Sequence, residues 1–342
     1  MASPLHIDPL PPLLAVSTAS RLAARAAKER ERLAGALKGD RSPVTVADLA
    51  VQVVVLAVLR ACGAPYSDRI VGEESAESLD GPDGSAMLRE AWELMTFALG
   101  AAGFASAIPQ SEHEIRELLD AGGLDPQTEQ RDAFWCLDPI DGTKGFLRGG
   151  QFAIALGLVQ NEEPKLGILG CPHLPLGIAE DYGKTDPVGS TYLGTIDSDG
   201  PRAFAGPSSA TTLKELQPIH VAQKVPQSEV RVCLSYEKAH SDKDRTSSAL
   251  THDGVNVVPI RIDSQCKYAM VASGRADLYL RLTRGDYREK SWDHAAGTAV
   301  VRAAGGIAED MTGKSLLFPG RILDTTGGIC VRTPVVQRPR IG

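Results

Sequence analysis

The stretch LDPIDGTKGF, residues 137–146, limits the possible folds of this chain more than any other segment. The apolar run AFWCL directly before it indicates a buried strand. The Pro139–Ile140 pair cannot lie inside a regular helix, and Asp141–Gly142 is typical of a turn. Asp138 and Asp141 are therefore predicted three residues apart in an irregular turn at a strand end. Two carboxylates so close together need a proton, a cation or solvent to offset their repulsion.

Strand and helix patterns along the chain predict two parts of different character. Helical periodicity is followed by strand hairpins in the first part, whereas strands and helices alternate in the second. The polar segment 206–218 separates them. We therefore expect an α+β domain over residues 1–205 and an α/β domain over residues 206–342. The helices are predicted over 13–36, 42–63 and most of 85–120, and the hairpins over 151–172 and 189–206.

Composition excludes several classes of protein. The 342 residues are 43% hydrophobic, which is enough for a large core, and carry a formal net charge of -7 without a long basic run. A nucleic-acid polymer is therefore not an expected partner. The longest apolar runs are too short to span a membrane. The six cysteines lack metal-like or paired spacing, so we expect reduced core thiols in a cytoplasmic monomer without a membrane partner.

Acidic residues recur where strands end or helices begin. Glu73 follows Gly72 at the end of a short strand, and Asp293 follows Trp292 before an apolar helix. Each has a plain alternative: Glu73 could be a solvated turn residue, Asp293 an N-cap, and Asp48 the fourth residue of a capping box that begins at Thr45.

Together these acids indicate a metal site, because ligand sites of α/β folds gather at strand ends. Oxygen ligands without His or Cys suit Mg²⁺, and the spacing does not fit an EF-hand loop. Two Mg²⁺ ions roughly 4 Å apart would neutralise the carboxylates and activate a water molecule.

The motifs VGEES, LDPIDGTKGF and WDHAAGTAVVRAAGG, in this order, resemble those of the inositol monophosphatase superfamily of Mg²⁺-dependent, lithium-sensitive phosphatases. Within it, SPVTVADLAVQ, EKAHS, DSQCKYAMVASG and EKSWDHAAG are similar to motifs of the salt-tolerance type of 3'(2'),5'-bisphosphate nucleotidase. The resemblance runs from residue 42 to 306. It implies a layered αβαβα sandwich and hydrolysis of adenosine 3',5'-bisphosphate to AMP and phosphate, with action on the 5'-phosphosulfate analogue.

The resemblance also implies roles for individual residues. Two or three Mg²⁺ ions would be bound, the first by Glu73, Asp138 and the Ile140 carbonyl, the second by Asp138, Asp141 and Asp293. Asp48 and Thr143 would position and deprotonate the attacking water. The residues implied to contact the substrate are Gly142, Thr143, His240, Ser264, Lys267, Arg281 and Asp293.

Several interpretations stay open at this point. His240 lies in a polar segment typical of solvated loops, Lys267 could extend its amine out of an apolar helix, and Arg281 could point outward from a strand. An inositol phosphate phosphatase would share every metal ligand. A catalytically inactive nucleotide sensor is disfavoured because it would need neither Asp48 nor Thr143.

Overall fold

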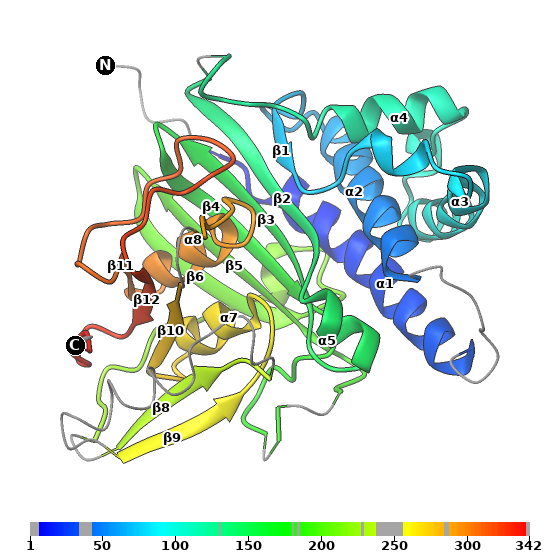
Figure 1. The fold of residues 1–342 in the computed structure, drawn as a ribbon. Coiled ribbons are helices and arrows are strands. Elements are labelled where there is room, and N and C mark those ends of the chain that lie inside the picture. The colour runs from blue at the N-terminus through cyan, green and yellow to red at the C-terminus, as the bar shows by residue number, and fades with distance from the viewer. Residues whose placement is uncertain are drawn as a thin grey trace.

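The computed structural model describes residues 7–33, 43–129, 131–179, 181–182, 185–226, 229–236, 256–283 and 287–339. Their helices and sheets are stacked as an α/β sandwich, with a helical layer, a large sheet, a second helical layer and a small sheet (Figure 1). This arrangement confirms the expected fold class. His240 lies outside the described residues.

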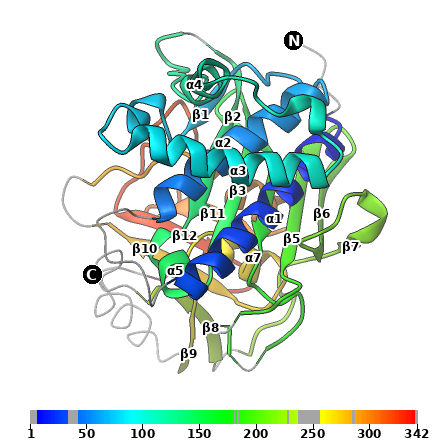
Figure 2. The same ribbon diagram turned by 90° about the vertical axis from the view of Figure 1, so that its right-hand side faces the viewer.

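The outer helical layer and the large sheet come from residues up to 218, so β7 lies beyond the predicted first domain. The helices are α1 (Leu10–Leu33), α2 (Pro43–Ala61), α3 (Gly84–Ala101) and α4 (Glu112–Asp120), and Figure 2 shows them on one side of the sheet. The sheet has the order β1 to β7; β1 runs parallel to β2, and the other pairs are antiparallel. Its strands are β1 (Ile70–Gly72), β2 (Ala133–Asp141), β3 (Ala153–Gln160), β4 (Glu163–Cys171), β5 (Ser190–Asp197), β6 (Gly200–Pro207) and β7 (Gln217–Pro218).

The inner helices α7 (Cys266–Ala272) and α8 (Ala295–Ala303) contact both sheets. The small sheet has the order β11-β12-β10-β8-β9, with β8 parallel to both β9 and β10. Its strands are β8 (Glu229–Leu234), β9 (Asn256–Arg261), β10 (Leu278–Leu282), β11 (Ile307–Asp310) and β12 (Gly328–Arg332). Shorter helices are α5 (Thr143–Arg148), η1 (Ala76–Leu79), η2 (Ala105–Ala107) and η3 (Leu213–Glu215). The domain division at residue 205 stays a prediction.

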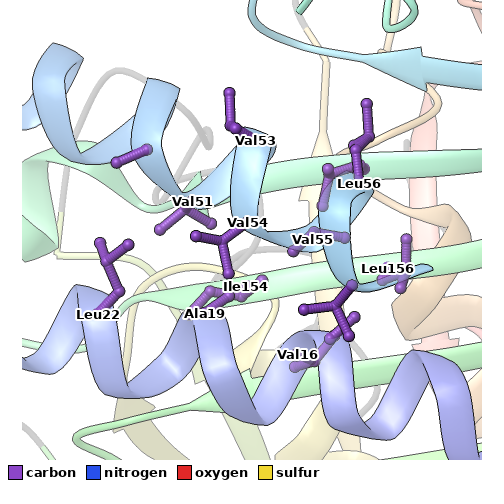
Figure 3. Close-up of a cluster of buried hydrophobic side chains, with 14 of the residues drawn as sticks. Val16, Ala19, Leu22, Val51, Val53, Val54, Val55, Leu56, Ile154 and Leu156 are labelled. Carbon is purple, nitrogen blue, oxygen red and sulfur yellow. The ribbon is translucent and has the colours of Figure 1, made fainter. Parts of the chain in front are cut away.

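Alternate residues of the strands point to opposite faces of the large sheet. Both sets of side chains are buried because helices cover each face. On β2, Trp135 and Leu137 pack toward α1 and α2, whereas Phe134 and Cys136 pack toward α7 and α8. Figure 3 shows side chains of α1, α2 and β3 packed together on the first of these faces. All six cysteines are free and five are buried, as expected. No helix among the described residues combines the length and the apolar character needed to cross a bilayer.

Three glycines on neighbouring strands allow α8 to lie close to the large sheet. A Cβ atom at Gly157, Gly167 or Gly194 would lie within 3.0 Å of the α8 backbone. At Gly167 it would be 2.2 Å from the Ala296 carbonyl oxygen. Any larger residue there must push the helix away from the strands.

We therefore expect Gly167→Ala to destabilise the fold by about 1–3 kcal/mol, the usual cost of overpacking. The melting temperature should fall measurably in a thermal scan. Gly100→Ala, in α3, is the matched control, because a Cβ atom there meets no neighbouring atom within 4 Å and alanine favours helix. Equal melting temperatures for the Gly167 variant and the unaltered chain would contradict this packing argument.

Candidate active site

A β-bulge at the end of β2 places Asp138 and Asp141 on the same face of the sheet. Asp138 pairs with Ala155 and Asp141 with Ala153, so Pro139 and Ile140 together oppose a single residue of β3. In a regular strand, residues three apart would point to opposite faces. Because of the extra residue in the bulge, Asp138 and Asp141 instead point to the same face. The Ile140 side chain packs in the core on the α1–α2 side. Both carboxylates therefore face α7 and α8.

The two aspartates line a cavity of about 360 Å³, which also receives Glu73 from the end of β1 and Asp293 from the segment before α8. Four predicted metal ligands from three separate segments thus meet in one cavity. The Ile140 backbone lies at the same cavity. The other predicted site residues that line it are Gly142, Thr143, Ser264, Lys267 and Arg281.

Three carboxyl groups in this cavity, those of Glu73, Asp138 and Asp141, have raised pKa values and hold protons more tightly than usual. Burial, reinforced by the charge of Glu73, raises the pKa of Asp138 well above its ordinary value. Burial and the neighbouring Asp293 raise the pKa of Glu73 to about 7 and that of Asp141 to about 6. The Oδ1 atom of Asp138 is buried without a hydrogen-bond partner among the described residues. An orphaned carboxylate oxygen among oxygen-only donors fits a hard divalent cation such as Mg²⁺.

Asp48 is buried inside α2, close to the carboxyl groups of Glu73 and Glu74. Burial is the largest cause of its raised pKa. The capping-box interpretation was wrong, because α2 begins at Pro43 and Thr45 is already helical. Thr143 begins α5, which packs against α2, and its side chain is exposed at the cavity. In the described part of the chain no hydrogen bond joins Asp48 to Thr143.

Gly142 and Ser264 face each other at the cavity with left-handed backbone conformations, at φ values of 90° and 62°. A Cβ atom on Gly142 would lie 2.8 Å from the Ser264 Cβ. Glycine is therefore required at position 142 both for its conformation and for this close approach. The next peptide after Ser264 donates from the Gln265 amide to the Asp141 carboxylate, which ties the start of α7 to the end of β2.

The two predicted cationic residues lie on the α7–β10 side of the cavity. Lys267 is buried, with its Nζ atom 3.3 Å from Ser235 Oγ, so it does not extend into solvent as the alternative held. Burial lowers the pKa of its amine. Arg281 is half-buried and its Nη2 atom lies 3.5 Å from the Asp293 carboxylate, so it does not point outward.

A buried network holds Arg281 in place. The Glu289 carboxylate is fully buried and accepts a hydrogen bond from Arg281 Nε at 2.8 Å. Its other oxygen lies 3.0 Å from His294 Nε2, and His294 Nδ1 lies 2.8 Å from the Tyr268 hydroxyl. Glu289, Asp293 and His294 could by distance form a metal site. The Arg281 guanidinium and the His294 imidazole already contact the two Glu289 oxygens. The arginine cation therefore occupies the position that a metal ion would take beside Glu289. The N-cap of α8 is His294, so the N-cap interpretation of Asp293 was wrong.

Comparison with known proteins gives the family of the chain. The model of the inositol monophosphatase family matches residues 13–339. The chain belongs to the inositol monophosphatase family. Among curated relatives, a 3'(2'),5'-bisphosphate nucleotidase of Oryza sativa is 39% identical and covers 92% of this chain and 87% of its own. A Schizosaccharomyces pombe protein of the same name is 34% identical, covering 88% and 83%.

Solved structures show the same fold at lower sequence identity. The crystal structure of CysQ from Bacteroides thetaiotaomicron, described as a bacterial member of the inositol monophosphatase family, has a TM-score of 0.61 and 19% identity. It covers 94% of this chain and 96% of its own.

Two residues that the sequence analysis missed support the site in this family member. Gln52, fully buried on α2, accepts from the Glu74 amide at 3.2 Å and donates to the Glu74 carbonyl at 2.8 Å. Glu289 holds Arg281. A polar residue inside the apolar run AVQVVV was a signal for Gln52. Glu289 had no comparable signal, because nothing in the motif EKSWDHAAG indicates its contact with Arg281 on β10.

The raised carboxyl pKa values predict how pH affects stability without metal. A folded-state pKa above the unfolded value contributes stability below the unfolded pKa, and this contribution disappears as pH rises through the folded pKa. For Glu73 this pH window runs from its ordinary pKa to about 7. For Asp141 it runs from its ordinary pKa to about 6. In EDTA, the melting temperature should therefore be higher near about pH 5.5 than near about pH 8. Saturating Mg²⁺ should reduce the difference, and so should Glu73→Gln. If the melting temperature of Glu73→Gln depended on pH as strongly as that of the unaltered chain, the raised pKa assigned to Glu73 would be contradicted.

Proposed function

We propose that this chain is a Mg²⁺-dependent phosphatase that hydrolyses adenosine 3',5'-bisphosphate to AMP and phosphate, and also acts on 3'-phosphoadenosine 5'-phosphosulfate. The observation that carries the proposal is one cavity that is lined both by the four carboxylates and by the cations Lys267 and Arg281. The names of the curated relatives support the substrate class. A substrate with two phosphate groups suits a cavity that has both a cation site and its own fixed cations.

In this proposal the chain binds two Mg²⁺ ions, or three, through the residues that line the acidic side. Glu73, Asp138 and the Ile140 carbonyl would hold the first ion, and Asp138, Asp141 and Asp293 the second. When bound, the metal lowers the pKa of a water molecule and neutralises charge on the phosphate.

The remaining steps rest on side chains of the protein. Asp48 and the Thr143 hydroxyl would orient the attacking water and accept its proton, which is general-base work. Burial raises the pKa of Asp48, which makes its carboxylate a stronger base. Gly142 and Thr143 would contact the scissile phosphate. Lys267, Arg281 and Ser264, together with His240, would bind the nucleotide beyond it.

Phosphate release from a substrate panel tests the proposal. We expect rapid, Mg²⁺-dependent release from adenosine 3',5'-bisphosphate and far slower release from inositol 1,4-bisphosphate. Preference for the inositol substrate would instead support the rival phosphatase. Tight nucleotide binding without any phosphate release would support the inactive sensor.

A further inference from the structure

Arg321, in the segment between β11 and β12, reaches from the C-terminal part of the chain to the end of β1. Its Nη2 atom donates to the Gly72 carbonyl at 3.0 Å, and Nη1 donates to the Gly122 carbonyl at 3.0 Å. Gly72 directly precedes Glu73. The Gly72 amide also donates to the Gly122 carbonyl at 2.8 Å, so the guanidinium closes a compact group of three backbone contacts.

The same segment is fixed to the chain that precedes Asp293. The Ser291 amide donates to the Arg321 carbonyl at 3.0 Å, and Lys290 and Ile322 form an antiparallel bridge. The Arg321 guanidinium lies 4.9 Å from the centre of the Trp292 ring, a distance typical of a cation–π contact. Trp292 directly precedes Asp293. One side chain thus contacts the neighbours of two acids on different elements.

We infer that Arg321 is a positioning residue that sets the placement of Glu73 relative to Asp293 before a metal ion binds. This inference rests on the proposed metal site. Glu73 directly follows a three-residue edge strand, and Gln52 holds the loop only through the next residue, Glu74. Among the residues that the structure describes, no hydrogen bond or ion pair joins the Glu73 segment directly to the Asp293 segment. Outer groups that fix metal ligands raise affinity because less freedom is lost on binding.

The chemistry of the contact requires arginine. Two carbonyl oxygens accept from two different nitrogen atoms while the planar face lies against an indole. Guanidinium offers this combination, whereas the lysine ammonium is a compact point charge without a planar fork. Arg321→Lys therefore keeps the charge and removes the double contact.

Titration of Mg²⁺ into the substrate-free chain, followed by calorimetry, tests the inference without any activity measurement. Arg321→Lys should weaken Mg²⁺ binding by about ten- to a hundredfold, the usual effect of losing a group that orients metal ligands. In a Glu73→Gln background the same change should have little further effect, because its action runs through Glu73.

Arg332→Lys is the matched control, because Arg332 likewise makes two side-chain hydrogen bonds, one to the Glu309 carboxylate and one to the Val336 carbonyl. It should lower stability without weakening Mg²⁺ binding. Unchanged Mg²⁺ affinity in Arg321→Lys, even with a lower melting temperature, would overturn the inference and show a purely structural contact. If that variant does not fold, Trp292→Phe gives the same test with a few-fold expected loss.

The test separates this inference from the proposed function. A chain that binds Mg²⁺ normally but hydrolyses no bisphosphate would contradict the proposed activity and leave the affinity comparison valid. A chain that binds no Mg²⁺ would overturn the metal site and the role of Arg321 together.

Discussion

Asp141→Asn should lower the rate of phosphate release by on the order of 10³-fold or more while leaving the fold intact. Asp141 lies where the bulge of β2 meets α7, and the proposal gives it to the second metal ion. Asparagine keeps an oxygen that can accept from the Gln265 amide, so the contact between β2 and α7 survives. It removes the negative charge that a divalent cation needs. The loss should therefore appear in Mg²⁺ affinity and turnover, and not in circular dichroism.

The matched control is Asp199→Asn, which removes an exposed carboxylate from a turn of the large sheet. It should leave turnover and Mg²⁺ affinity unchanged. EDTA should abolish turnover of the unaltered chain, and Mg²⁺ should restore it. Near-normal turnover of Asp141→Asn in EDTA would be incompatible with metal-dependent catalysis in this cavity.

Lys267→Ala and Arg281→Ala should each weaken the use of adenosine 3',5'-bisphosphate by roughly ten- to a hundredfold. A charge-assisted contact contributes about 1.5–3 kcal/mol, which corresponds to this factor in binding. The loss should be seen in kcat/KM, and it should be small for a substrate that lacks the 5'-phosphate. Activity toward inositol 1,4-bisphosphate should start far lower and change little.

The structure makes the two variants unequal. Arg281→Ala leaves the buried Glu289 with only His294 as its partner, so this variant should also lose stability. Arg281→Lys keeps a cation near Glu289 and separates that effect from substrate recognition. Lys214→Ala, which removes an exposed cation from η3, is the control for a general change in charge. Unchanged nucleotide kinetics in both pocket variants would remove Lys267 and Arg281 from the substrate site and leave the phosphatase proposal without its specificity.

Local patterns in the sequence were sufficient for most elements and for the acidic motifs. The continuous apolar run AFWCL predicted a buried strand, and the side chains on both faces of β2 do pack against helical layers. The Asp141–Gly142 pair marked the end of that strand because its backbone requirement is local. Pro139 did not, because it lies inside β2 at the bulge. Chemistry alone also indicated a hard cation, since the motifs contain carboxylates and lack His and Cys ligands.

Only the tertiary structure decided which acids share a face and what holds them there. The distance of three residues between Asp138 and Asp141 suggests opposite faces, and the pairing with β3 shows the bulge that reverses this. The capping-box and N-cap alternatives for Asp48 and Asp293 could be settled only by where α2 and α8 begin. Gln52 and Arg321 act through partners 22 and 249 residues away. A contact between segments so far apart depends on how the layers stack, which no local pattern records.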